Sequence, residues 1–135
     1  MASAGRTRIP RWQTWLGYVF SAAPVLMMLF SAWLKLSHNT QAVEQFVSHY
    51  GFAESTLFGL GALEAATVAV YLIPQTSVLG SIVMTGYLGG AVVTEFRVGS
   101  PLFLVPALLG ALAWGGLFMR DARLRALIPL RRRAG

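Results

Sequence analysis

Five side chains in an otherwise apolar chain have the chemistry to act on a small molecule: Lys35, Glu64, Tyr87, Glu95 and Arg97. A carboxyl group in apolar surroundings can donate or accept a proton, so Glu64 is the predicted catalytic acid or base. Glu95 is its predicted ionised counterpart, oriented by Arg97. Lys35, Tyr87 and Arg97 are predicted to line a substrate pocket, where the planar guanidinium could bind a carboxylate or a quinone oxygen.

Glu64 is the most informative of these residues because it lies inside an apolar segment. It is about nine residues into the stretch 55–73, which places it ~14 Å along a helix and near mid-bilayer. A charged carboxylate there costs at least ~2.5–3.5 kcal/mol on insertion scales, so it must face the bundle interior. The alternative is a structural interhelical hydrogen bond worth ~1 kcal/mol, but a neutral Gln would serve that role at lower cost.

Four apolar stretches must position these groups. The length of each is close to the ~20 residues that a membrane-crossing helix needs. They are residues 12–36, 55–73, 75–94 and 101–119. Hydrophobic residues make up 56% of the chain and charged residues 12%, against ~25% charged in an average soluble domain. Residues 101–119 carry no charge at all, whereas a soluble bundle needs a polar stripe on every helix. The sequence therefore predicts an all-α, four-helix transmembrane bundle, with residues 1–135 in a single domain.

The distribution of charge predicts the orientation of this bundle. Basic residues lie in the tails 1–11 and 120–135, while the segment between the first two spans has Glu44 and Glu54 and no Lys or Arg after Lys35. Short basic flanks stay cytoplasmic, so we expect both termini in the cytoplasm. The basic residues of these tails, which give the chain its net charge of +6, are then expected to contact anionic lipid headgroups at the cytoplasmic face. Nucleic-acid binding is not expected, because the basic residues lack interleaved aromatic platforms.

Residues 39–52 are too polar to cross the membrane and predict a short amphipathic interfacial helix between spans one and two. Val43, Phe46, Val47 and Tyr50 recur at helical spacing on its apolar face. Such a helix can act as a lid over the mouth of the bundle, although a plain interfacial connector is the more common case.

The predicted orientation also brings the polar side chains to one end of the bundle. The third span runs outward, so Tyr87 falls in its outer half and Glu95 and Arg97 at its outer end. Lys35 ends the first span on the same side, above Glu64. This set predicts a polar pocket entered from the outer leaflet or the periplasm, with Glu64 as its floor. Taken singly, Lys35 is also explained as a snorkelling end charge, and Glu95 and Arg97 as interfacial charges.

Small residues predict where helices approach one another closely. Gly86 and Gly90 form a GxxxG pattern in the third span, and Ala107, Ala111 and Gly115 have the same spacing in the fourth. Both sets are interpreted as helix-packing faces.

The chain has no cysteine, which excludes disulfides, thiolate metal sites and iron–sulfur ligation by this chain alone. Its two histidines, His38 and His49, both lie between the first two spans, so they cannot supply axial haem ligands from facing helices. No metal site is predicted.

The stretch 59–97 resembles the DoxX-like family of small bacterial four-helix membrane proteins. The matching segments are 61–64, 72–74, 86–91 and 97–99, and segments 35–36, 120–121 and 127–129 extend the resemblance over nearly the whole chain. The resemblance implies a bundle in the bacterial inner membrane with cytoplasmic termini. Relatives in the wider group resemble subunits that pass electrons from sulfur compounds to quinone, or that accompany redox enzymes. Many related sequences have His at the position of Glu95, so the departure favours carboxylate chemistry or a bare polar pocket over haem or metal ligation.

Three interpretations of function remain open. The first is a membrane oxidoreductase subunit or quinone-interacting subunit, which needs a partner subunit for sulfur or metal chemistry. The second is a stand-alone enzyme that uses Glu64 and Glu95 for proton transfer on a lipophilic small molecule. The third is a structural or assembly subunit, in a complex or a homo-oligomer, in which Glu64 only bonds a neighbouring helix. We favour a small integral membrane protein with a polar intramembrane pocket, associated with quinone-linked or other membrane redox chemistry.

Overall fold

The computed structural model describes residues 9–127, and the chain is helical over most of this length. Four long helices form the bundle: α1 (Arg11–Leu36), α3 (Thr56–Leu72), α4 (Ser77–Arg97) and α5 (Leu104–Arg120). The shorter elements are α2 (Thr40–Val43), its π-helical continuation (Glu44–His49), the 3-10 turns Pro74–Thr76 and Pro101–Phe103, and α6 (Ala122–Leu127). The predicted all-α, four-helix bundle is confirmed, with a helix between its first two spans. The predicted tails fall partly on 1–8 and 128–135, which lie outside the described residues.

Three of the four long helices are long and apolar enough to cross a membrane: α1, α4 with its preceding turn (Pro74–Arg97), and α5 with its preceding turn (Pro101–Arg120). The fourth, α3, is a shorter apolar helix of 17 residues. It stops at Leu72 because Ile73 precedes a proline and adopts an extended backbone, with φ −76° and ψ 119°. Its length lies at the lower end of the ~17–25 residues typical of membrane-crossing helices.

Each long helix buries residues spaced three or four positions apart, which places them on one face. In α3 this buried face consists of Leu57, Gly61, Glu64, Thr67, Val68 and Tyr71. The remaining surface of the bundle carries many exposed large apolar side chains, which suits contact with lipid.

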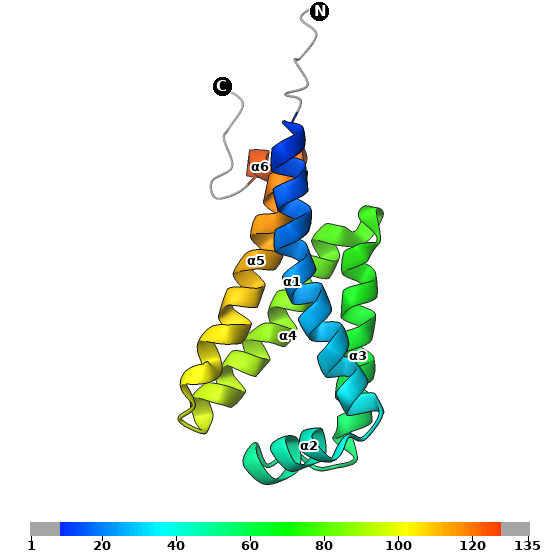
Figure 1. Cartoon of the computed structure of the whole chain (residues 1–135), viewed down its shortest axis with the longest axis vertical. Coiled ribbons are helices and arrows are strands. Elements are labelled where there is room, and N and C mark those ends of the chain that lie inside the picture. Colours follow the sequence, from blue (N-terminus) through cyan, green and yellow to red (C-terminus); the bar gives the residue numbers. More distant parts are fainter. Residues whose placement is uncertain (1–8, 128–135) are drawn as a thin grey trace, which may run out of the picture.

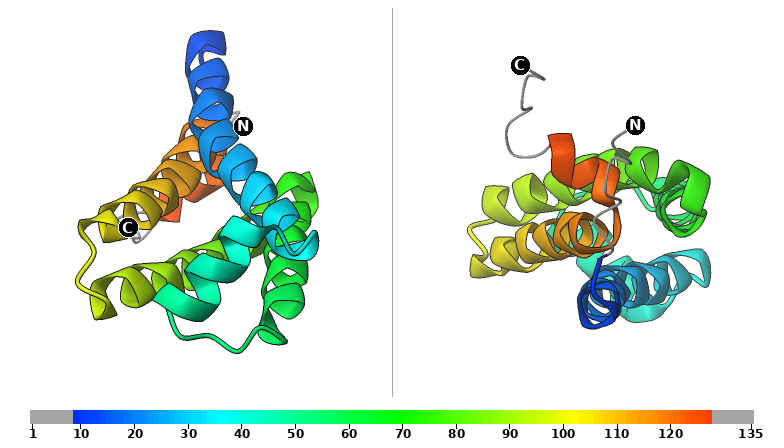
Figure 2. Two further views of the ribbon diagram at one scale, coloured as in Figure 1. Left: turned by 60° about the horizontal axis from the view of Figure 1, so that its bottom comes forward. Right: turned by 90° about the horizontal axis from the view of Figure 1, so that it is seen from above.

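The long helices contact one another in the order α1, α3, α4, α5 and back to α1 (Figures 1 and 2). α6 and the first turns of α1 lie at one end of the bundle, and α2 lies at the opposite end (Figure 1). From their crossing near α6, α1 and α5 diverge toward the end that carries α2 (Figures 1 and 2).

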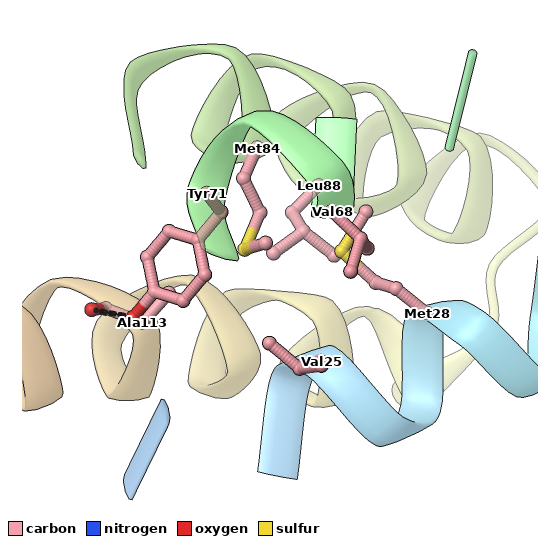
Figure 3. Packing of buried hydrophobic residues seen from close by; sticks show 7 residues of the cluster. All are labelled: Val25, Met28, Val68, Tyr71, Met84, Leu88 and Ala113. Carbon is pink, nitrogen blue, oxygen red and sulfur yellow. Dashed lines mark hydrogen bonds between the residues drawn. The ribbon is translucent and has the colours of Figure 1, made fainter. Parts of the chain in front are cut away.

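A buried apolar cluster joins all four long helices in the middle of the bundle (Figure 3). Its members are Val25, Met28, Val68, Tyr71, Met84, Leu88 and Ala113. The Tyr71 hydroxyl is hydrogen-bonded to the Ala113 carbonyl oxygen at 2.8 Å (Figure 3) and to Ser21 Oγ at 2.7 Å. Arg120 Nη2 donates to the same Ser21 oxygen at 3.0 Å. These bonds fasten α1, α3 and α5 together at the α6 end.

The predicted packing faces of the third and fourth spans are wrong. A Cβ atom added at Gly86 or Gly90 would have no atom within 4 Å, so no helix packs against them. In α5, Ala107 and Ala111 are exposed. The close contact uses Gly116 instead, where an added Cβ would lie 2.6 Å from the carbonyl oxygen of Gly17 in α1.

Candidate functional site

A cavity of about 510 Å³ lies among the four long helices, toward the α2 end of the bundle. This volume falls in the ~300–1,000 Å³ range of small-molecule sites. Its walls are mostly apolar and include Met28, Leu60, Leu88, Val105 and Leu109. The connector, residues 37–55 between α1 and α3, adds Gln45, Phe46, Tyr50 and Phe52 to the lining.

A buried ion pair forms the polar floor of this cavity. Lys35 Nζ lies 2.7 Å from Glu64 Oε2, and each side chain is only 3% exposed. The same ammonium donates to Ser31 Oγ at 2.5 Å, and the Tyr87 hydroxyl donates to Glu64 Oε2 at 3.2 Å. Because both bonds to the carboxylate are made to Oε2, Oε1 keeps its lone pairs for a further donor.

The close approach of α1 and α3 explains why Lys35 reaches Glu64. Gly61 lies one turn before Glu64 on the buried face of α3, and a Cβ added there would be 3.0 Å from the Lys35 Cβ. It would also be 3.2 Å from the Ala32 carbonyl oxygen. The interpretation of Lys35 as a snorkelling end charge is therefore wrong, because its side chain turns into the bundle rather than toward the membrane surface.

Two aromatic rings also surround the ammonium group of Lys35. Its Nζ lies 4.8 Å from the ring centroid of Phe46 and 5.8 Å from that of Tyr87. Cation–π attraction at these distances strengthens when water is excluded. Phe46 comes from the connector, so the charged floor and the connector form one contiguous site.

A second cluster of polar side chains holds the connector against the end of α4. The Tyr50 hydroxyl is hydrogen-bonded to Glu95 Oε1 and, at 2.8 Å, to Gln45 Nε2. The guanidinium of Arg97 donates to the Tyr50 carbonyl oxygen. Burial, and then the hydrogen bond to the Glu95 carboxylate, raises the pKa of Tyr50 to about 12.

Of the five residues singled out in the sequence, Lys35, Glu64 and Tyr87 meet directly at the cavity floor. Glu95 also lines the cavity, but it bonds Tyr50 at the mouth. It lies eight residues beyond Tyr87, or ~12 Å along α4, so the two glutamates occupy different levels. Arg97 is exposed and outside the lining, and it bonds the backbone of the connector.

Sequence reasoning missed Ser31 and Gln45 as polar members of the site. Ser31 is one helical turn before Lys35, so the i, i+4 spacing was the available signal. Gln45 carries no such signal, because it lies between Val43 and Phe46 and outside the predicted apolar face of the connector helix. Within residues 9–127, no group of three or more His, Cys, Asp or Glu side chains is placed to hold a metal ion.

No curated protein and no solved structure gives a significant match. A family model described as the DoxX-like family matches residues 19–116, which include all four long helices for most of their length. The chain therefore belongs to the DoxX-like family and is a small integral membrane protein.

Proposed function

We propose that this protein binds a lipophilic molecule with an oxygen-bearing head, of the quinone class, and serves quinone-linked redox chemistry in the membrane. The observation that carries the proposal is the Lys35–Glu64 pair at the floor of an apolar cavity. Replacing a buried ion pair by packed apolar side chains is often neutral or stabilising, so the pair is poorly explained by stability alone. A ligand that uses both charges explains it better.

The donors and acceptors of the floor suit a quinone and its quinol. A quinone oxygen accepts a hydrogen bond from the Lys35 ammonium or the Tyr87 hydroxyl, and a quinol hydroxyl donates to Glu64 Oε1. Reducing the quinone consumes two electrons and two protons, and Glu64 is the group placed to pass protons. The electrons come from a redox centre in a partner subunit, since the chain has no cysteine to hold an iron–sulfur cluster.

Retention of quinone by the purified protein tests this proposal. Gly90 lines the cavity and a Cβ there meets no atom within 4 Å, so Gly90→Leu fills the cavity without displacing the backbone. Gly89 is equally unobstructed but does not line the cavity, so Gly89→Leu is the matched control. Native mass spectrometry in mild detergent should show membrane quinone on the unmodified and Gly89→Leu proteins and about tenfold less on Gly90→Leu, a loss of ~1.4 kcal/mol. The proposal is overturned if the two variants retain equal amounts of quinone, or if none of the three proteins retains any.

We also propose that both termini face the cytoplasm of a bacterial inner membrane and that the connector faces the periplasm. Arg11 and α6, with Arg123 and Arg125, lie at one end of the bundle, which supports this orientation (Figure 1). The cysteine-free chain allows single-cysteine variants at two exposed positions. In intact cells, a membrane-impermeant maleimide should label Ser48→Cys and not Ala126→Cys. The reverse pattern would show the opposite orientation.

A further inference from the structure

We propose that the ligand is a single-tailed amphiphile that enters the cavity sideways from the bilayer, through an opening between α1 and α5. When the ligand is bound, its tail lies in this opening. This inference rests on the proposed quinone-class binding and adds the route and the tail. It follows from how the four seams between neighbouring helices are closed.

Each of the other three seams carries a contact that joins its two helices. Gly61 brings α1 against α3, and the Tyr87–Glu64 hydrogen bond joins α4 to α3. The seam between α4 and α5 is held by the bond from Trp114 Nε1 to Thr85 Oγ1, at 2.5 Å. At the end of the same seam, Phe96 packs edge-on against Phe103, 5.6 Å between ring centroids.

The fourth seam, between α1 and α5, is closed at the α6 end and widens toward the cavity. Its tight contacts are Gly17 against Gly116 and Arg120 against Ser21, all at the crossing near α6. Beyond the crossing the two helices diverge in both views (Figures 1 and 2). The halves of α1 and α5 nearer the connector are therefore farther apart than the halves at the crossing.

Three apolar side chains, from α1 and from α5 with its preceding turn, both line the cavity and are exposed. Met27 of α1 is 51% exposed, Val105 of α5 is 43% exposed and Leu102 is 57% exposed. We call these three residues the portal. All are apolar, so the portal admits a hydrocarbon chain at no desolvation cost and opposes the passage of a polar solute.

The carboxylate of the polar floor and the α5 side of the portal belong to helices on opposite sides of the bundle. Glu64 belongs to α3, which is the helix opposite α5 in the order of contacts. A head bonded to Lys35 and Glu64 therefore directs an attached tail toward the portal. The connector end is the alternative route, but Tyr50 is bonded there to both Glu95 and Arg97.

Photo-crosslinking tests the route and the tail together. The probe is a benzoquinone with a diazirine at the end of a short alkyl tail, added to the protein in lipid nanodiscs and competed with the same quinone lacking the diazirine. Competable adducts should map to the portal residues Met27, Leu102 and Val105. Competable adducts confined to residues 44–52 would overturn the lateral route while leaving the proposed function intact. Absence of any competable adduct would overturn both.

A second measurement separates the route from the binding site. Met27→Trp should narrow the portal and slow both the uptake and the release of quinone severalfold. Leu26→Trp is the control, since Leu26 is 65% exposed and does not line the cavity. Equal exchange rates in the two variants would contradict the lateral route.

Discussion

The Nζ atom of Lys35, at the end of α1, lies 2.7 Å from Oε2 of Glu64, in the middle of α3. Each charge neutralises the other in surroundings that exclude water from both. The pair therefore behaves as one unit, and the consequences of changing either residue depend on the other.

Lys35→Met should lower the free energy of unfolding by ~3–5 kcal/mol, because it leaves the buried Glu64 carboxylate without its counter-charge. The double variant Lys35→Met/Glu64→Leu should recover most of this loss, since apolar side chains replace both charges. Denaturant unfolding in mixed micelles measures both values. A double variant as unstable as the single one would show that the two residues are not coupled.

Glu64→Gln separates the two functional interpretations from the structural one. The amide keeps the size of the side chain and its bonds to Lys35 and Tyr87, but it cannot release or take up a proton. We expect a folded protein whose membranes lose quinone-dependent electron transfer when the variant replaces the native chain. Loss of electron transfer without loss of the fold would fit either functional interpretation, and retained electron transfer with only a change in stability would fit the structural one.

Gly116→Ala should destabilise the crossing of α1 and α5. The added Cβ would lie 2.6 Å from the Gly17 carbonyl oxygen and would overlap Ser21 Oγ, so a helix must shift at a cost of ~1–3 kcal/mol. Gly115→Ala is the matched control, because nothing lies within 4 Å of a Cβ there. Thermal unfolding in detergent should show a lower midpoint for Gly116→Ala alone. Equal midpoints would mean that this contact is not tight.

The attachment of the connector should depend on pH through Tyr50. Its pKa is raised from 10.0 to about 12, so the stability contributed by the neutral phenol is complete below about pH 10. It is lost as the pH rises through 12, when the phenolate is repelled by Glu95. A spin label at Ser48→Cys should become more mobile over this interval.

Two matched variants check the assignment to Tyr50. Tyr50→Phe removes the hydroxyl bond to Glu95, so the label should already be mobile at neutral pH and lose its alkaline transition. Tyr18→Phe changes an exposed tyrosine near the other end of the bundle and should leave the transition in place. A transition unaffected by Tyr50→Phe would assign it to another group.

The sequence was sufficient for the number of helices and for the inward position of Glu64. Both follow from strong constraints, because a bilayer sets the helix length and penalises a carboxylate that faces lipid. The apolar face of the connector could also be predicted from the sequence, because Phe46 and Tyr50 are apolar residues at helical spacing among polar ones.

The packing of the helices could not be read in the same way. A membrane helix is apolar on all sides, so its buried face has no contrast with the lipid-facing one. The spacing of Gly86 and Gly90 therefore predicted a helix contact, although both residues border the cavity. Nothing in the sequence around Gly116 of α5 indicated that this residue contacts α1. The pairing of Lys35 with Glu64 depends on the crossing point at Gly61, which only the three-dimensional arrangement supplies.

The 17 residues of α3 have a consequence for the membrane around it. A helix of this length covers ~25 Å, several ångströms less than a ~30 Å hydrocarbon layer. Lipids beside α3 must thin to match it, while those beside the 26-residue α1 need not. We therefore expect the bilayer to be thinner on one side of the protein, beside the helix that carries Glu64, and the protein to favour membranes with short or disordered acyl chains.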